Sequence, residues 1–202
     1  MRRATLPGAP RGTRRGVAAV EFALMAPVLL TLLVAMVEAV SYVRAWYRLE
    51  QAAGSAAEAG ARTQRLDKAT VEGVFAAARA VAEPYAAWNT GTSGSRARTV
   101  VNGISNTGSG NVVAWACSRG DATLAPNVAG AAPAPAVTLP AGFVVPRGQT
   151  VILVEIISVR PPFMRAATEY FLRATGSLQM HAYAIVRPRV TELDSVSGGC
   201  PA

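Results

Sequence analysis

The sequence has few of the residues on which catalytic and metal sites are usually built. It contains one histidine and two cysteines in 202 residues. His181 has no cysteine or carboxylate at a spacing typical of metal ligands or of a catalytic pair, so we interpret it as a residue at the surface or edge of a strand. The sequence has no phosphate-binding loop, nucleophile elbow or HExxH helix. We therefore expect no enzymatic activity, no cofactor, no metal and no small-molecule substrate.

Charge is also scarce, and it is unevenly placed. Only 16% of the residues are charged, and the net charge is +8. Five arginines precede residue 17, and the remaining 15 Lys and Arg face 12 Asp and Glu, which leaves only +3. Because no basic stripe with interleaved aromatic residues follows, we expect no nucleic-acid partner. A basic tail beside an apolar run is more typical of an orientation signal at a membrane.

That apolar run covers residues 17–43, VAAVEFALMAPVLLTLLVAMVEAVSYV. As a helix it would be about 40 Å long, enough for a hydrocarbon core of about 30 Å. We expect residues 1–16 to form a disordered cytoplasmic leader, residues 17–43 a single transmembrane helix, and residues 44–202 a domain on the far side of the membrane. A cleavable secretory signal is the competing interpretation, but the run is longer than a typical signal core and no small-x-small site follows it cleanly.

Helical patterns continue beyond the membrane segment. Residues 44–62 contain good helix formers and small residues at four-residue spacing, which allow another backbone to approach closely. That backbone could belong to the same domain or to a neighbouring subunit. A second helix is predicted over residues 67–83, because apolar residues recur at helical spacing and Pro84 follows.

Strand patterns fill the rest. Residues 98–102 and 111–117 predict a hairpin with Val113, Trp115 and Cys117 on one face. The run 151–159 (VILVEIISV) predicts a central strand covered on both faces, and residues 178–186 alternate as a last strand. A short helix is predicted over residues 163–174. The expected fold class is α+β: the transmembrane helix extended into a pilin-like helix, a second helix, then a small antiparallel sheet.

Two features of this domain stand apart. Residues 118–150 are dominated by Ala, Pro and Gly and predict a surface excursion or flexible loop. Glu155 is a lone carboxylate in an apolar strand, and we expect it to face Arg160 or Arg187 or to lie at an exposed edge.

The two cysteines lie far apart in the sequence. The spacing of Cys117 and Cys200 excludes a CxxC redox or zinc pair, so a disulfide in an oxidising compartment is the simplest joint role. Two unrelated thiols are the alternative.

The most informative stretch is Arg14-Arg15-Gly16-Val17-Ala18-Ala19-Val20-Glu21-Phe22. A basic leader ends in Gly16, an apolar helix begins at Val17, and Glu21 stands at the fifth position of that helix, followed by Phe22. This pattern has the form of a type IV prepilin site, at which a membrane peptidase cuts after the glycine. An intramembrane carboxylate is costly unless it is paired. The new ammonium of Val17 in one subunit could meet Glu21 of its neighbour and set the register between packed helices.

At these residues the sequence resembles the TadE-like family. GVAAVEFALMAPVLL looks like the opening of such proteins, and VRPRV at Val186–Val190 resembles the end of their domain. The resemblance implies a minor pilin or pseudopilin of a Flp-type (tight-adherence) pilus, located as a single-pass protein in the bacterial inner membrane with its C-terminal domain periplasmic or extracellular. The implied partners are the membrane, the prepilin peptidase, other pilus subunits and the assembly platform. An unprocessed, membrane-anchored binding or scaffold protein of the cell envelope is the alternative.

Overall fold

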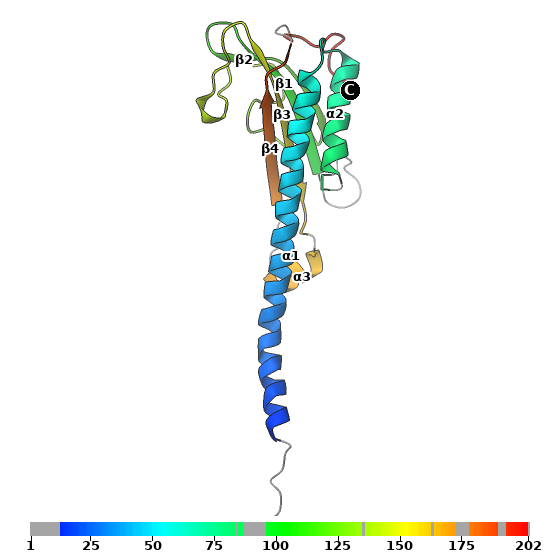
Figure 1. Ribbon diagram of the computed structural model, residues 1–202, viewed down its shortest axis with the longest axis vertical. Coiled ribbons are helices and arrows are strands. Elements are labelled where there is room, and N and C mark those ends of the chain that lie inside the picture. The colour runs from blue at the N-terminus through cyan, green and yellow to red at the C-terminus, as the bar shows by residue number, and fades with distance from the viewer. Residues whose placement is uncertain are drawn as a thin grey trace, which may run out of the picture. The chain divides into compact units, whose positions relative to one another are not determined.

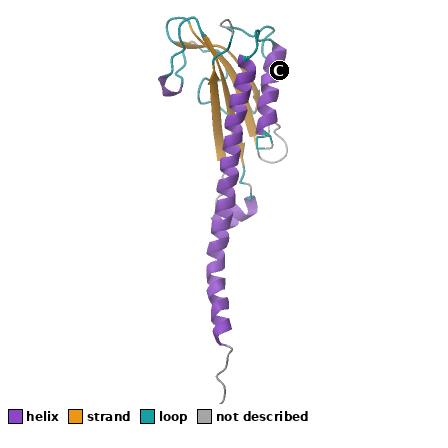
Figure 2. Cartoon of the chain, in the orientation of Figure 1, coloured by secondary structure: helices purple, strands orange, loops and turns teal. Residues whose placement is uncertain are grey.

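The computed structural model describes residues 13–83, 85–86, 96–134, 136–162, 164–172, 178–189 and 193–201. The chain divides into two compact units. The first contains residues 1–39 and 164–175, and the second contains residues 40–163 and 176–202. Figure 1 and Figure 2 show the elements of both units.

The first helix, α1, runs from Thr13 to Ala61 and is 49 residues long. It begins four residues before the expected start at Val17, while residues 1–12 of the predicted leader lie outside the described residues. Its most apolar 18-residue window has a mean hydropathy of 2.3 and is only 6% buried. The core helix of a soluble protein would be largely buried. This helix is instead exposed, and it is long and apolar enough to cross a membrane. Within the described residues, one helix near the N-terminus is thus long and apolar enough to cross a membrane, as predicted.

The first unit also contains a short helical segment. Helix α3 covers Arg165–Ala167, and η2, a π-helical turn, covers Thr168–Leu172. These elements fall within the helix predicted over residues 163–174. Phe163, Arg173 and Ala174 lie outside the described residues.

The second unit contains helix α2 and a four-stranded sheet. Helix α2 runs from Lys68 to Ala82. The strands are β1 (Arg96–Asn106), β2 (Asn111–Gly120), β3 (Thr150–Arg160) and β4 (Leu178–Val186). Their order is β2-β1-β3-β4, and every neighbouring pair is antiparallel. The α+β fold class and the predicted order of elements are confirmed.

One face of the sheet packs against α2 and the second half of α1. Most of the small residues at four-residue spacing in α1 face this core and are buried: Ala52, Ala53, Ala56, Ala57 and Ala61. They meet apolar side chains from the sheet, including Ile152, Val154, Ile156, Met180 and Ala182. Close approach through small side chains therefore serves packing within this chain's own domain. The stripe of alanines is not a free surface for a neighbouring subunit.

The other face of the sheet is covered by the segment between β2 and β3. Its described residues, 121–134 and 136–149, contain one short 3₁₀ turn, η1 (Pro140–Gly142), and an isolated bridge between Ala134 and Val113 of β2; the rest of their backbone is irregular. Their side chains Leu124, Ala129, Leu139 and Val145 are buried against this face. The Ala/Pro/Gly-rich segment is thus a covering layer. Strand β3 lies between β1 and β4 and is buried on both faces, as its continuous apolar pattern predicted.

A β-bulge shifts the register between β1 and β2. Gly103 pairs with Trp115, but Ile104 pairs with Val113, so Ala114 is the extra residue. Trp115 and Cys117 consequently lie on the helix side, whereas Val113 packs under the covering segment. The prediction that all three share one face was wrong, because the bulge turns Val113 over. A Cβ at position 103 would lie 2.0 Å from Nε1 of Trp115, so the bulge requires glycine there.

Candidate functional site

The residues expected at the processing site lie together near the start of α1. Gly16, Val17, Glu21 and Phe22 are all helical and exposed, with Val17 and Phe22 58% and 69% accessible. A Cβ added at Gly16 would have nothing within 4 Å. Nothing in the described chain therefore covers the Gly16–Val17 peptide bond.

The helical state of this bond has a chemical consequence. A peptidase binds its substrate with an extended backbone. For the predicted cleavage after Gly16, the residues around this glycine would therefore have to leave the helix first. A glycine in a helix lowers the stability of that helix by about 1 kcal/mol relative to alanine, so the helix opens more easily at Gly16.

Val17 and Glu21 are four residues apart and so occupy the same side of α1. Among the described residues, Glu21 has no hydrogen bond or ion pair to another side chain, and its side chain is exposed. Glu21 thus remains available for a partner outside its own chain.

A second carboxylate of α1, Glu38, does have partners within the chain. Its Oε1 accepts a hydrogen bond from the backbone N–H of Met164 and one from the hydroxyl of Thr168, the latter at 3.1 Å. Thr168 is buried, with 3% exposure. These bonds offset the cost of placing a carboxylate near the end of an apolar helix. Glu38 fastens α3 and η2 to α1, a role that the sequence did not suggest.

Glu155 is placed differently from our expectation. It faces neither Arg160 nor Arg187 and is fully buried in the centre of β3. One carboxylate oxygen accepts from the N–H of Asn127 and contacts Nε2 of His181. The other accepts from the N–H of Val128 at 3.2 Å. The spacing along the sequence gave no sign of a carboxylate beside His181, because Glu155 and His181 come from strands that are adjacent only in space.

The contacts of Glu155 connect the covering segment to the sheet. The two backbone donors belong to the covering segment, so Glu155 fixes that segment to the sheet. The side chain of His181 is 22% exposed, while that of Glu155 is wholly enclosed. Among the described residues, no group of three or more His, Cys, Asp or Glu side chains is arranged to hold a metal ion.

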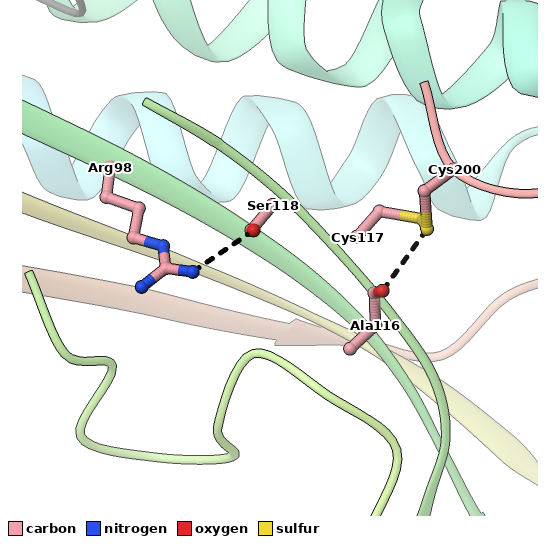
Figure 3. Close-up of a disulfide and its surroundings, with 5 residues drawn as sticks. All are labelled: Arg98, Ala116, Cys117, Ser118 and Cys200. Carbon is pink, nitrogen blue, oxygen red and sulfur yellow. Dashed lines mark hydrogen bonds between the residues drawn. A yellow bond between two sulfur atoms is a disulfide. The ribbon is translucent and has the colours of Figure 1, made fainter. Parts of the chain in front are cut away.

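The predicted disulfide between Cys117 and Cys200 is present, with their Cα atoms 5.3 Å apart. It joins β2 to the C-terminal tail (Figure 3). The Sγ of Cys200 also lies 3.2 Å from the carbonyl oxygen of Ala116. Because a half-cystine sulfur carries no proton, this is a close contact and not a donated hydrogen bond.

The tail before Cys200 is held by further bonds. The indole N–H of Trp115 donates to the carbonyl of Leu193 at 2.8 Å, and the N–H of Ser197 donates to the carbonyl of Leu66 at 2.8 Å. The disulfide therefore completes an ordered attachment of the C-terminal tail to the sheet and to the turn after α1.

Two aspartates, the exposed Asp67 and the half-buried Asp121, have a lowered pKa. Hydrogen bonds from the hydroxyl and then the N–H of Thr70 lower the pKa of Asp67, which caps the N-terminus of α2. Hydrogen bonds from the hydroxyl and N–H of Thr123, together with the charge of Arg96, lower the pKa of Asp121. Both arrangements favour the carboxylate form of a turn or cap.

Comparison with known proteins adds one match. Residues 16–62 match the family model described as TadE-like protein. The match begins at Gly16 and ends one residue beyond α1, and it does not extend to the Val186–Val190 segment. No curated protein matches the sequence. No solved structure matches the fold. The recognition made from GVAAVEFALMAPVLL is confirmed over the part of the chain that carries it, and residues 16–62 are a TadE-like segment.

Proposed function

We propose that this chain is a minor pilin or pseudopilin that takes part in assembling a Flp-type, tight-adherence pilus or a related secretion system. The observation that carries the proposal is the TadE-like match, which starts at Gly16, the residue after which the prepilin-type pattern expects cleavage. TadE-like proteins are associated with Tad/Flp pilus systems. In this proposal the chain performs no chemistry and acts by packing and docking.

The proposed topology follows from charge. Arginines crowd the N-terminal side of the apolar run, so residues before Gly16 stay in the cytoplasm and the sheet domain is translocated. The disulfide supports this orientation, since disulfides persist in oxidising compartments such as the bacterial periplasm. The membrane is then the bacterial inner membrane, crossed once.

The proposed role of Glu21 is to set the register between subunits. After cleavage, the ammonium of Val17 in one subunit would pair with Glu21 of the next, each neutralising the other in a poorly solvating environment. Two features support the pairing: Glu21 is exposed, and no described side chain of its own chain bonds to it. Phe22, exposed beside it, would pack on the neighbouring helix.

N-terminal sequencing tests the processing step. Protein purified from membranes of cells with an active prepilin peptidase should begin at Val17, and protein from peptidase-inactive cells should begin at Met1. A chain that keeps Met1 in the active cells would contradict the proposal.

The pairing of Glu21 between subunits can be tested separately from cleavage. Glu21→Ala should leave cleavage intact but abolish piliation, whereas the matched control Glu50→Ala, an exposed carboxylate farther along α1, should preserve both. Normal piliation with Glu21→Ala would show that the pair is not needed.

An unprocessed, membrane-anchored binding or scaffold protein is the second candidate. It is favoured by the burial of the alanine stripe within the chain's own domain, which removes one surface for packing between subunits. The family match also leaves residues 63–202 uncovered. Under this alternative the chain keeps Met1 and tolerates Glu21→Ala in every assay.

A further inference from the structure

A basic and aromatic cleft opens on the second unit where α1 leaves its apolar run. Its volume is about 430 Å³. Its lining comes from α1 and from the third residue after α2: Arg44, Tyr47, Arg48, Gln51 and Tyr85. Arg44 and Arg48 are one turn apart on the same side of α1. The lining of this open cleft thus combines two arginines, two tyrosines and a glutamine.

The charge of this cleft is uncompensated. Its lining contains no carboxylate, and neither arginine forms an ion pair with any residue in the described part of the chain. Other arginines of the domain do have partners: Arg96 pairs with Asp121, and Arg119 with Glu72. The cleft therefore has the chemistry of an anion site, and guanidinium groups suit phosphate because they donate two hydrogen bonds in a fork.

The position of the cleft along α1 indicates which kind of anion it would meet. The apolar run of residues 17–43 is about 40 Å long as a helix, close to the ~40–45 Å of a bilayer with its headgroup regions. The next turns, which carry Arg44 and Arg48, then emerge at the level of the far headgroups. Trp46 and Tyr47 are 46% and 61% exposed at this level, as expected for an aromatic belt at a membrane interface.

The two arginines also oppose the orientation signal. Positive residues next to the translocated end of a membrane helix disfavour the topology that the N-terminal arginines impose. An anionic ligand at Arg44 and Arg48 offsets this conflict, because it neutralises the charges after translocation.

We propose that this cleft binds the phosphate headgroup of an anionic phospholipid in the distal leaflet of the membrane. Arg44 and Arg48 hold the phosphate, and the phenols of Tyr47 and Tyr85 donate to its oxygens or to the glycerol hydroxyls. This inference goes beyond the proposed pilus function. It rests only on α1 crossing the membrane, so it survives or fails independently of processing and piliation.

The test uses the full chain in lipid nanodiscs made of equal parts phosphatidylglycerol and phosphatidylcholine, followed by native mass spectrometry that counts the lipids retained. Wild type should retain phosphatidylglycerol in preference to phosphatidylcholine. R44Q/R48Q should reduce that retention by about tenfold or more, because glutamine cannot replace the charge-assisted, forked hydrogen bonds that arginine donates to a phosphate. The matched control is R187Q/R189Q, which removes two exposed arginines beside Ala61 at the other end of α1 in this domain.

Three outcomes would overturn the proposal. Equal retention by wild type and R44Q/R48Q is one, and loss of retention in R187Q/R189Q to the same extent is another. The third is competition: if millimolar inorganic phosphate displaces the lipid completely and binds equally well without a bilayer, the cleft is a free-phosphate site.

Two additional measurements keep the result interpretable. An intact Cys117–Cys200 disulfide in R44Q/R48Q verifies that the domain has folded, and Y85F should reduce retention less than the arginine variant does. If R44Q/R48Q keeps its lipid but no longer copurifies with other envelope proteins, the cleft binds a protein carboxylate instead, and the lipid proposal is wrong.

Discussion

The carboxylate of Glu155 on β3 contacts Nε2 of His181 on β4 along a diagonal of the sheet. Their backbones are not directly opposite, since Glu155 pairs with Tyr183 and Ile157 pairs with His181. The contact and the two N–H donors of Asn127 and Val128 all converge on one buried side chain. Glu155 is therefore the point at which the covering segment, β3 and β4 are joined.

Removing this carboxylate should loosen the covering segment first. Glu155→Ala leaves two backbone N–H groups and the imidazole without their acceptor, so we expect the free energy of unfolding to fall by about 3 kcal/mol. Glu155→Gln keeps one acceptor oxygen and should cost less. Denaturant titration in detergent and hydrogen exchange at Asn127 and Val128 measure the two effects.

The control for this prediction is Glu58→Ala. Glu58 pairs with Arg62 on the exposed surface of α1, and such pairs contribute at most about 1 kcal/mol. Equal losses in Glu155→Ala and Glu58→Ala would contradict the assigned role of Glu155.

The disulfide should contribute strongly to stability. It joins residues 83 positions apart, and in the chain-entropy model a loop of this size stabilises the folded state by about 4 kcal/mol. We expect C117S/C200S and reduced wild type to lose similar amounts in denaturant titration, with faster hydrogen exchange around Ser197. A double variant as stable as the oxidised protein would contradict this expectation.

Asp67 provides a pH-dependent prediction. Because its pKa is lowered in the folded chain, its contribution to stability is fully present above the ordinary carboxyl pKa of about 4 and is lost as the pH falls through the lowered value. Thr70→Val should move the pKa of Asp67 back toward the ordinary value. A ¹³C NMR titration of the carboxyl carbon measures the shift. Thr63→Val is the control, since Thr63 bonds to the carbonyl of Gly60 and not to Asp67.

The same substitution, Asn to Val, should have opposite effects on stability at Asn102 and at Asn111. The side-chain amide of Asn102 is fully buried in β1 and neither of its polar atoms has a hydrogen-bond partner, so Asn102→Val should raise the free energy of unfolding by about 1 kcal/mol. Asn111 donates to the carbonyl of Phe143 and accepts from the N–H of Val145, both at 2.8 Å. Asn111→Val should therefore destabilise by about 1–3 kcal/mol. If both variants shift the thermal unfolding midpoint in the same direction, the prediction is contradicted.

The elements whose patterns are local were predictable from the sequence. The apolar run of α1 was evident from its length and lack of charge, and the helical spacing in α2 and the alternation in β4 each reflect burial of one face. The order of these elements set the α+β class. The buried strand β3 was equally clear, because nine successive residues carry mainly β-branched side chains. The disulfide followed from there being only two cysteines.

The features that depend on register were not predictable. The contact between Glu155 and His181 requires the pairing of two strands separated by residues 161–177, and the position of Val113 requires a bulge that no local pattern announces. The covering segment was also missed, because single apolar residues such as Leu139 and Val145, spread among Pro, Gly and Ala, leave no periodic signal. Glu38 and its partners 126 and 130 residues away belong to the same class.

The Cys117–Cys200 bond also changes what a single backbone cut can do to this protein. Strands β3 and β4, the covering segment and residues 164–172 all lie between the two half-cystines. A protease that cuts the backbone once within that interval produces two pieces that stay joined by the disulfide, so neither piece can diffuse away. In the proposed topology, with the domain translocated, this gives a tolerance to proteolysis that lasts as long as the surroundings remain oxidising.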